Sequence, residues 1–497
     1  MSAPVAPAAF PSLRIARDTL TPLGPFAEAQ AAFLQPDALA VQRLDDLLHD
    51  RNVGVVAHFY MDPELQGVLS ACKWPHIHIS DSLVMADRAV DMAKAGVQAI
   101  CVAGVDFMAE NVRAVLDHAG FAALPVYRLA AGEIGCSLAA SAEAPAYAAF
   151  LRQAAQTSNS LHVIYINTSL RVKAHAHRLV PTITCTSSNV VRTILQATSQ
   201  VPDLHIWFGP DTYMGENLRH LFTAYAQLPD DRIHALHPAH DQASIRGLLQ
   251  RFHAFQQGNC IVHQLFGPAV AQAVRERHSD ALITAHLEVP GELFALASQA
   301  AVEGRGVVGS TSDILSCILD HVKAALRQPG PARIPVVLGT EAGLMTSIVL
   351  GVQAVLRASG RDDVTVEILF PVAAEAATAD ADSPLGVIPG ASNGEGCSTA
   401  GGCATCPYMR MNHLDGLLDA LQLVGTPSVA LEALRPRMDP RRVTGQTVAQ
   451  LGSVPILHMR DFQRSGRLSD VLVTEVTGRT PLRMSLEDLA SWPMRRA

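Results

Sequence analysis

Residues 55–60 read VVAHFY, residues 163–168 read VIYINT and residues 282–288 read LITAHLE. Each stretch begins as an apolar strand and ends in two polar side chains two residues apart, which therefore lie on one face of the strand. The pairs are His58 with Tyr60, Tyr165 with Asn167, and His286 with Glu288. Their recurrence indicates one structural unit that is repeated three times along the chain.

The three segments share further signals in the same order. A second strand-like run (HIHISDS, TITCTSS, GVVGSTS) carries hydroxyl residues at its carboxyl end. A third run ends in glycine, any residue and an acid, which is Asp106, Asp211 or Glu341, and an acid at that place can cap the following helix. A fourth apolar run (AALPVYRL, RIHALHP, VTVEILFPV) precedes a loop that contains Cys136, Cys260 or Cys406.

Alternating strand and helix patterns predict parallel sheets covered by helices on both faces, with ligands bound beyond the carboxyl ends of the strands. We therefore predict an α/β protein of three similar αβα domains, each with a parallel four-stranded sheet, arranged with pseudo-threefold symmetry around a central active site. The alternative is a triplicated sequence whose units do not converge. The predicted divisions are an N-terminal extension over 1–40, domains over 41–150, 151–275 and 276–420, and a C-terminal extension over 421–497. No role is assigned to the C-terminal extension, whose runs look strand-like.

The resulting protein should be globular, because 49% of its 497 residues are hydrophobic and 17% are charged. The net charge of −8 argues against a nucleic-acid partner. The apolar stretch 334–356 holds Pro335, Gly339 and Gly343, which favour a strand, a turn and a helix over a membrane span. The opening MSAPVAPAAF lacks the pattern of a secretory signal, so we expect a cytoplasmic protein.

Nine cysteines scattered over a long chain do not form the dense, even set of a disulfide-stapled domain. Three of them, one from each repeat, suit a [4Fe–4S] cluster, and the absence of a fourth thiolate would leave one iron open as a Lewis acid. Cys72, Cys101, Cys185 and Cys317 lie in apolar or strand-like sequence and are expected to be small buried hydrophobes.

The glycine-rich stretch GEGCSTAGGCATCPYM supports a competing interpretation. It contains Cys397, Cys403 and Cys406, and the Cys403-x-x-Cys406 spacing occurs in zinc sites and redox pairs. A zinc site needs two further ligands nearby, and the sequence offers no second such pair there. A zinc or thiol module centred on these three cysteines remains the alternative.

A series of motifs between about Val55 and Leu414 resembles the quinolinate synthases. In order, they are AHFYMDPELQ, SDSL, GVDFMAE, GCSLA, YINTS, CTSSN, FGPD, GNCIVHQ, GSTS, GTEAGL and CPYMRMN. The resemblance implies a condensing enzyme that joins iminoaspartate to dihydroxyacetone phosphate in de novo NAD biosynthesis, giving quinolinate, phosphate and water. It also implies a [4Fe–4S] cluster acting as a Lewis acid, and a possible partner enzyme that oxidises aspartate to iminoaspartate. A non-catalytic iron–sulfur redox sensor is the alternative.

The same resemblance implies that Cys136, Cys260 and Cys406 bind the cluster. It implies substrate-binding roles for His58, Tyr60, Ser82, Tyr165, Ile166, Asn167, Ser187, His263, His286, Leu287, Glu288, Ser310 and Thr311. Catalytic roles are expected for Glu288 as a general acid and base, and for Tyr60 as a proton donor or orienting group. His58 and His286 are further candidates for proton transfer, or for hydrogen bonding to substrate carboxylates.

Overall fold

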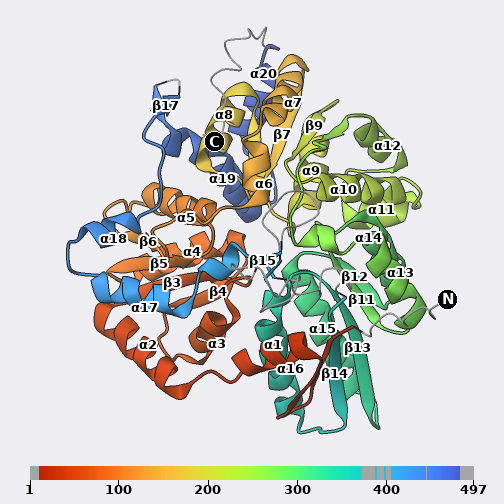
Figure 1. The fold of residues 1–497 in the computed structure, drawn as a ribbon. Coiled ribbons are helices and arrows are strands. Elements are labelled where there is room, and N and C mark those ends of the chain that lie inside the picture. Colours follow the sequence, from red (N-terminus) through yellow and green to blue (C-terminus); the bar gives the residue numbers. More distant parts are fainter. Residues whose placement is uncertain (1–9, 372–386, 389–396, 399–404, 444, 482–497) are drawn as a thin grey trace, which may run out of the picture. The chain divides into compact units, whose positions relative to one another are not determined.

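The computed structural model describes residues 10–371, 387–388, 397–398, 405–443 and 445–481 (Figure 1). The chain divides into two compact units. Unit 1 comprises Met1–Asn52, Ala57–Asp81 and Ile261–Gly425, and unit 2 comprises Val53–Val56, Ser82–Cys260 and Thr426–Ala497. Each unit is assembled from segments that are far apart in the sequence.

Three parallel arrays of strands share one topology. The first sheet contains β3 (Val53–His58), β4 (Ile77–Ser80), β5 (Ala99–Ala103) and β6 (Val126–Arg128) in the order β4-β3-β5-β6. The second contains β7 (Ser160–Tyr165), β8 (Thr182–Cys185), β9 (His205–Gly209) and β10 (Phe252–Ala254) in the order β8-β7-β9-β10. The third contains β11 (Leu282–His286), β12 (Gly306–Gly309), β13 (Ala332–Gly339) and β14 (Val364–Leu369) in the order β12-β11-β13-β14. Counted along the chain, each array runs 2-1-3-4, which confirms the α/β class and shows the repeat in the strand order.

Helices connect these strands. They are α1 (Pro25–Phe33), α2 (Ala38–Arg51), α3 (Pro63–Ala71), α4 (Ser82–Lys94), α5 (Asp106–His118), α6 (Ser137–Ala142), α7 (Pro145–Gln156), α8 (Leu170–Leu179), α9 (Val190–Gln200), α10 (Thr212–Tyr225), α11 (Asp230–Leu236), α12 (Gln242–Gln250), α13 (Pro268–Arg277), α14 (Gly291–Val302), α15 (Thr311–Leu326), α16 (Met345–Ser359), α17 (Leu414–Leu423), α18 (Val429–Ala433), α19 (Val448–Ser465) and α20 (Asp470–Gly478). Because β12 and β13 flank β11 on opposite sides, right-handed crossovers place α14 and α15 on opposite faces of the third sheet.

The third sheet has six strands, and its last two are antiparallel. β1 (Ser12–Ile15) pairs with β14, and β2 (Leu20–Leu23) pairs with β1. Leu13 and Ile15 are fully buried in the same apolar core as α15 and α16, and Ser12 Oγ donates to Glu367 Oε1 at 2.9 Å. The expected four-stranded parallel sheet is therefore wrong for this repeat. β1 lies in the segment 1–40, which is predicted to stand outside the repeats, and Glu367, the hydrogen-bond partner of Ser12, is 355 residues away in the sequence.

The expectation that the run RIHALHP forms a strand is wrong. The run RIHALHP lies mainly in helix α11, and β10 supplies the fourth strand of its sheet. Pro229 precedes this helix, and Asp230 and Asp231 stand in its first turn, where acidic side chains interact favourably with the helix dipole.

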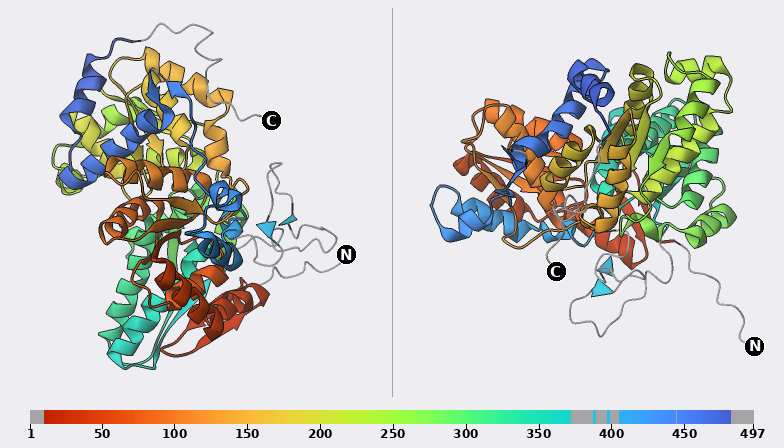
Figure 2. Two further views of the ribbon diagram at one scale, coloured as in Figure 1. Left: turned by 90° about the vertical axis from the view of Figure 1, so that its left-hand side faces the viewer. Right: turned by 90° about the horizontal axis from the view of Figure 1, so that it is seen from above.

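The strand-like runs of the C-terminal extension lie mainly in helices α19 and α20, and only Arg442–Val443 and Gln446–Thr447 form short paired strands. Thr447 and Gln450 form a capping box that starts α19, and Gly466 ends it in the left-handed conformation. A Cβ at Gly452 would lie 2.2 Å from the Leu170 carbonyl oxygen, so a glycine allows α19 to approach α8 closely within unit 2. This segment is thus an ordered part of unit 2 (Figures 1 and 2).

The apolar stretch 334–356 forms β13, the short 3₁₀ helix Ala342–Leu344 and α16, as the sequence predicts. Within the described part of the chain, Ala342–Ser359 is the one helical stretch whose length and composition would allow it to cross a membrane, and 56% of it is buried inside the protein.

The N-terminal strand should contribute to stability as a core element. We expect Leu13→Ala to lower the free energy of unfolding by about 2–5 kcal/mol, because this fully buried side chain would leave a cavity. Leu23→Ala is the control, since Leu23 is 61% exposed in β2 and its loss should cost about 0.5 kcal/mol or less. Urea unfolding measures both, and equal small losses would contradict the assignment of β1 to the core.

Candidate active site

The carboxyl ends of β3, β11 and β13 bring several predicted residues together in unit 1. β3 ends at His58 and is followed by Tyr60, and β11 ends at His286 and is followed by Glu288. Thr340 follows β13, and His263 opens the 3₁₀ helix His263–Leu265. His58, His263, His286, Glu288 and Thr340 are each 7% exposed or less, so this is an enclosed polar site.

A continuous hydrogen-bonded chain runs through this site. Glu288 Oε2 lies 3.1 Å from His263 Nδ1, and His263 Nε2 lies 3.4 Å from Thr340 Oγ1. Thr340 Oγ1 in turn lies 2.9 Å from the Tyr60 hydroxyl. Each member can donate and accept a proton, so the chain connects a carboxylate to a phenol without an intervening gap. Thr340 was not among the predicted site residues; it directly follows the glycine of the third Gly-x-acid motif.

The two strand-end histidines share one local geometry. The Tyr60 amide donates to His58 Nδ1 at 3.2 Å, and the Glu288 amide donates to His286 Nδ1 at 3.3 Å. In both rings the acceptor role of Nδ1 places the proton on Nε2. Burial lowers the pKa of His58 to about 4 and the pKa of His286 to about 3, and the nearby Glu288 carboxylate opposes both shifts. At pH 7 both are therefore neutral donors through Nε2.

Ser310 and Thr311 begin α15 and are almost fully buried. Ser310 Oγ donates to Asp313 Oδ2 at 2.7 Å and accepts from the Asp313 amide, so its hydroxyl is already part of a capping box. Ser82 begins α4, and Ser187 lies in the turn between β8 and α9. These two belong to unit 2.

The predicted residues Tyr165, Ile166 and Asn167 follow one another at the end of β7 in unit 2. Lys173 on α8 anchors this turn, because its ammonium donates to the carbonyl of Thr168 and, at 3.1 Å, to that of Ile166. Lys173 is 0% exposed, which is rare for a lysine unless it has partners. The residue stands in an ordinary helical pattern, RVKAHAH, so only the fold reveals its role.

Glu110 on α5 is the acidic partner of Lys173. It accepts the Leu170 amide at 2.8 Å, next to the start of α8. Burial raises the pKa of Glu110 and lowers the pKa of Lys173, and the attraction between the two groups opposes both shifts. Through its bond with the Leu170 amide, Glu110 ties α5 to the start of α8, the helix that carries Lys173.

Each cysteine loop is hydrogen-bonded to the Gly-x-acid turn of its own repeat. In the first repeat the Asp106 amide donates to Ile134 O at 3.0 Å. In the second the Thr212 amide, next to Asp211, donates to Gly258 O at 2.7 Å. In the third the Cys406 amide donates to Glu341 Oε1 at 2.9 Å.

The acids of the three turns have different roles. Asp211 and Glu341 cap the following helices, as predicted, whereas Asp106 pairs with the buried Arg128 at 2.8 Å. Arg128 also donates to the Gly132 carbonyl at 2.7 Å, so it supports the loop of Cys136. Burial raises the pKa of Glu341 to about 8, against the effect of its two amide donors.

The loops of Cys136 and Cys260 are directly connected within unit 2. Ser137 Oγ, from the residue after Cys136, donates to Asn259 O, from the residue before Cys260, at 3.1 Å. A Cβ at Gly258 would lie 2.2 Å from Pro210 O, so a glycine is required there. Cys136, Cys260 and Cys406 are all partly exposed and belong to no disulfide, as metal ligation requires. Cysteine thiolates are the ligand type that iron–sulfur clusters take.

The other cysteines divide into two groups. Cys101 and Cys185 are fully buried, as predicted, whereas Cys72 and Cys317 are only partly buried. The backbone of Cys397 lies in the short strand β16 (Cys397–Ser398), and Cys403 lies outside the described residues.

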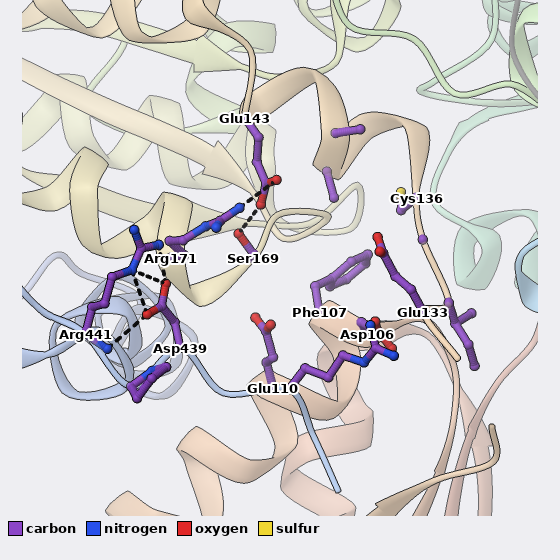
Figure 3. Close-up of a pocket in the computed structure, with 16 residues that line it drawn as sticks. Asp106, Phe107, Glu110, Glu133, Cys136, Glu143, Ser169, Arg171, Asp439 and Arg441 are labelled. Carbon is purple, nitrogen blue, oxygen red and sulfur yellow. Dashed lines mark hydrogen bonds and ion pairs between the residues drawn. The ribbon is translucent and has the colours of Figure 1, made fainter. Parts of the chain in front are cut away.

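A cavity of about 620 Å³ opens beside Cys136 in unit 2 (Figure 3). Cys136 lies on one side, and Asp439 and Arg441 from the C-terminal segment lie on the other. Arg171 pairs with Glu143 at 2.8 Å across its wall. The C-terminal extension thus contributes to the surroundings of a candidate cluster ligand, a role that the sequence does not predict.

Known proteins resemble this chain over most of its length. The family model described as "Quinolinate synthetase A protein" matches residues 42–350. The chain is 53% identical over 480 residues to "Quinolinate synthase, chloroplastic" of Nicotiana tabacum, covering 94% of this chain and 66% of that protein. It is 49% identical to the protein of the same name in Arabidopsis thaliana, covering 94% and 67%. The "Quinolinate synthase" of Thermosynechococcus vestitus is 30% identical over 276 residues, or 56% of this chain and 67% of that protein.

The chain belongs to the quinolinate synthase family. Its named relatives are enzymes of NAD biosynthesis, and this chain spans about two thirds of the length of the plant quinolinate synthases that it matches. The predicted cytoplasmic location is wrong, because four plant relatives with 49–53% identity are named as chloroplast proteins. The absence of a secretory pattern does not address this possibility, because plastid-targeting segments have a different composition.

The buried pair of Lys173 and Glu110 should be energetically coupled. We expect Lys173→Met to lower the free energy of unfolding by about 3–5 kcal/mol, because it leaves Glu110 buried without its partner. The double variant Lys173→Met/Glu110→Gln should recover part of that loss. Urea unfolding of the two single variants and the double variant tests this coupling, and strictly additive losses would show that there is none.

The neutral histidines should make the protein sensitive to acid. The pKa of His286 lies near 3 in the folded chain against 6.5 for the free side chain, so stability is present above pH 6.5 and is lost as the pH falls towards 3. Between pH 7 and pH 5, His286→Gln should lose about 2 kcal/mol less than the wild type. His234→Gln on the exposed face of α11 should follow the wild type, and an unchanged profile for His286→Gln would refute the shift.

Proposed function

We propose that this protein condenses iminoaspartate with dihydroxyacetone phosphate to give quinolinate, phosphate and water. Family membership supports the reaction. The observation that carries the proposal is the hydrogen bond between each cysteine loop and the Gly-x-acid turn of its own repeat. A link between loop and turn in every repeat, formed by the backbone in the first two and by the Glu341 side chain in the third, favours one common ligand over three unrelated cysteines. The plant relatives further support a plastid location.

Cys136, Cys260 and Cys406 would hold a [4Fe–4S] cluster. When bound, such a cluster with three thiolate ligands supplies a Lewis acid, which suits a condensation with no net electron transfer. We place this site at the centre of a pseudo-threefold arrangement of the three repeats. The donor set agrees with the partly exposed thiols and with the link between the loops of Cys136 and Cys260.

The residues of unit 1 would carry the proton transfers. Glu288 takes a proton from a substrate carbon or returns it, and His263 shares that proton through Nδ1. Thr340 connects His263 to the Tyr60 hydroxyl by hydrogen bonds. This hydroxyl donates to or orients an oxygen of the substrate. His58 and His286, which are neutral at pH 7, would donate through Nε2 to substrate carboxylates.

Hydroxyl and backbone donors would bind the anionic groups of the substrates. We assign this role to Ser82, Ser187, Thr311 and the backbone around Ser310, because they stand where strands give way to helices. Tyr165, Ile166 and Asn167 would contact the substrate from the turn that Lys173 anchors. Iminoaspartate is unstable in water, so an enzyme that oxidises aspartate is the expected supplier.

The cluster assignment is tested by counting iron and sulfide after oxygen-free isolation. We expect about four irons per chain in the wild type, and loss of the iron in Cys136→Ser, Cys260→Ser and Cys406→Ser. Cys317→Ser, at a partly exposed cysteine on α15, is the matched control and should retain the iron. Iron that survives all three substitutions, or a protein that binds zinc through Cys397, Cys403 and Cys406, would contradict the proposal.

The proton-transfer assignment is tested in protein that carries its iron. Glu288→Gln and Tyr60→Phe should each lower kcat for quinolinate formation by about 10²–10⁴-fold with unchanged iron content. Glu292→Gln, on the exposed first turn of α14, should behave as the wild type. Binding of both substrates without turnover in the wild type would instead favour the non-catalytic iron–sulfur sensor.

A further inference from the structure

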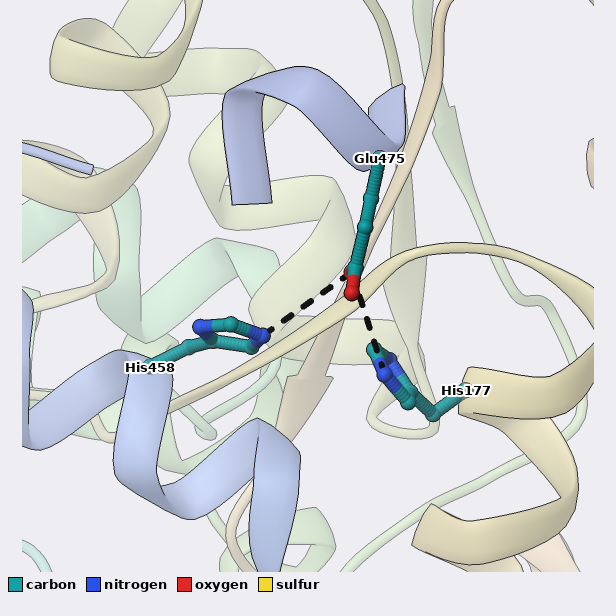
Figure 4. Close-up of side chains that lie close together, drawn as sticks. All are labelled: His177, His458 and Glu475. Atoms are coloured by element: carbon teal, nitrogen blue, oxygen red, sulfur yellow. Dashed lines mark ion pairs between the residues drawn. The ribbon is translucent and has the colours of Figure 1, made fainter. Parts of the chain in front are cut away.

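Three side chains of unit 2 that the proposed reaction does not use face one another in Figure 4. They are His177 on α8, His458 on α19 and Glu475 on α20, and their ligand atoms all lie within 4.8 Å of one another. His177 Nε2 is 3.8 Å and His458 Nε2 is 4.0 Å from the same carboxylate oxygen, Glu475 Oε2. Two of the three helices belong to the C-terminal segment, for which the sequence suggested no role.

Two of these atoms are buried without a hydrogen-bond partner. His458 Nε2 and Glu475 Oε2 are inaccessible to solvent and unpaired, and His458 as a whole is only 7% exposed. A buried polar atom without a partner destabilises a protein, so its presence in a well-packed helical contact calls for an explanation. The separations of 3.8 and 4.0 Å are too long for direct hydrogen bonds. A ligand between the three side chains would satisfy both orphaned atoms.

We propose that His177, His458 and Glu475 bind a divalent transition-metal ion, for which zinc is the best fit. Two imidazole nitrogens and one carboxylate oxygen form an established zinc ligand set, with a water molecule completing the tetrahedron. Metal–ligand bonds of about 2.0–2.2 Å set the ligands of a tetrahedral ion about 3.3 Å apart. The two histidine–carboxylate separations of 3.8 and 4.0 Å would each have to shorten by about half an ångström or slightly more, and the third separation, which is within 4.8 Å, by up to about 1.5 Å.

The protonation of the ligands is compatible with this site. Burial lowers the pKa of His177 to about 4 and lowers the pKa of His458, so both rings are neutral at pH 7, as ligation requires. The Thr182 amide donates to His177 Nδ1 at 3.2 Å, which puts the ring proton on Nε2 in the metal-free protein. A metal held at Nε2 would require the ring proton on Nδ1, so the hydrogen bond from the Thr182 amide would be lost in exchange for the metal–nitrogen bond, and that amide would need another acceptor. The neighbouring cation, Arg479, donates to the Arg178 carbonyl.

The ion would fasten the two C-terminal helices to α8. His177 stands one helical turn after Lys173, the residue that anchors the turn of Tyr165, Ile166 and Asn167. A metal at this point would therefore stabilise the helix on which that turn depends. Its three ligands are separate from the proposed cluster ligands. This inference does not require the proposed reaction to be correct.

Elemental analysis of the full-length protein tests the site, with zinc and iron counted separately. After incubation with zinc and dialysis, we expect about one zinc per chain in the wild type and in the control His234→Ala, whose side chain is exposed on α11. His458→Ala and Glu475→Gln should lower zinc content at least tenfold and leave iron unchanged. Glu475→Gln keeps the size of the side chain, so it preserves the fold if His458→Ala does not, as circular dichroism will show.

Cobalt substitution separates this site from a cysteine site. Bound Co²⁺ should show ligand-field absorption without a thiolate-to-cobalt charge-transfer band, because no sulfur belongs to the set. Wild-type protein that holds no zinc after dialysis, or variants that hold as much as the wild type, would overturn the proposal. A thiolate-to-cobalt charge-transfer band would also overturn the proposal. None of these results depends on iron content or quinolinate formation, so the metal site and the proposed reaction fail separately.

Discussion

The hydrogen bond between the Gly-x-acid turn and the cysteine loop is the constraint from which the rest of the account follows. The turn ends the third strand of each repeat, and glycine is needed there because the chain is crowded. A Cβ at Gly339 would lie 2.2 Å from the Thr284 carbonyl oxygen, and a Cβ at Gly104 or Gly209 would lie within 2.7 Å of a neighbouring side chain. The crowding favours glycine at the turn, most strictly at Gly339, and the hydrogen bond holds the cysteine loop next to it. The motif at the end of a parallel strand thus determines where the cysteine loop lies.

The site also limits the positive charge close to Glu288. His58 and His286 stand at equivalent strand ends, each fixed through Nδ1 by the amide two residues later. Burial keeps both rings neutral, so they offer donors without bringing positive charge close to Glu288. Glu288 is then free to share its proton with His263 and, through Thr340, with Tyr60. In the proposed reaction, proton transfer and substrate binding are assigned to different groups of this buried site.

The sequence predicts what depends on local pattern. Apolar runs that end in polar pairs identify the first strands, and the Gly-x-acid motifs identify the third strands, because both signals arise from a few neighbouring residues. The sequence does not predict β1, whose partner strand β14 lies hundreds of residues away, or α11 and α19, whose ends depend on capping and dipole effects rather than on apolar runs. Lys173 and Thr340 are also missed, since their partners lie in distant segments and their own surroundings in the sequence are unremarkable. The role of the C-terminal helices is missed for the same reason, because their contacts with α8 form only when the chain folds.

The account is tested most directly by a crystal structure of the oxygen-free protein with iron located by anomalous scattering. It predicts one iron–sulfur cube bonded to the sulfur atoms of Cys136, Cys260 and Cys406, with one iron that has no protein ligand. A cube bonded through Cys397 or Cys403, or an ordered protein whose three loops carry no shared iron, would contradict it.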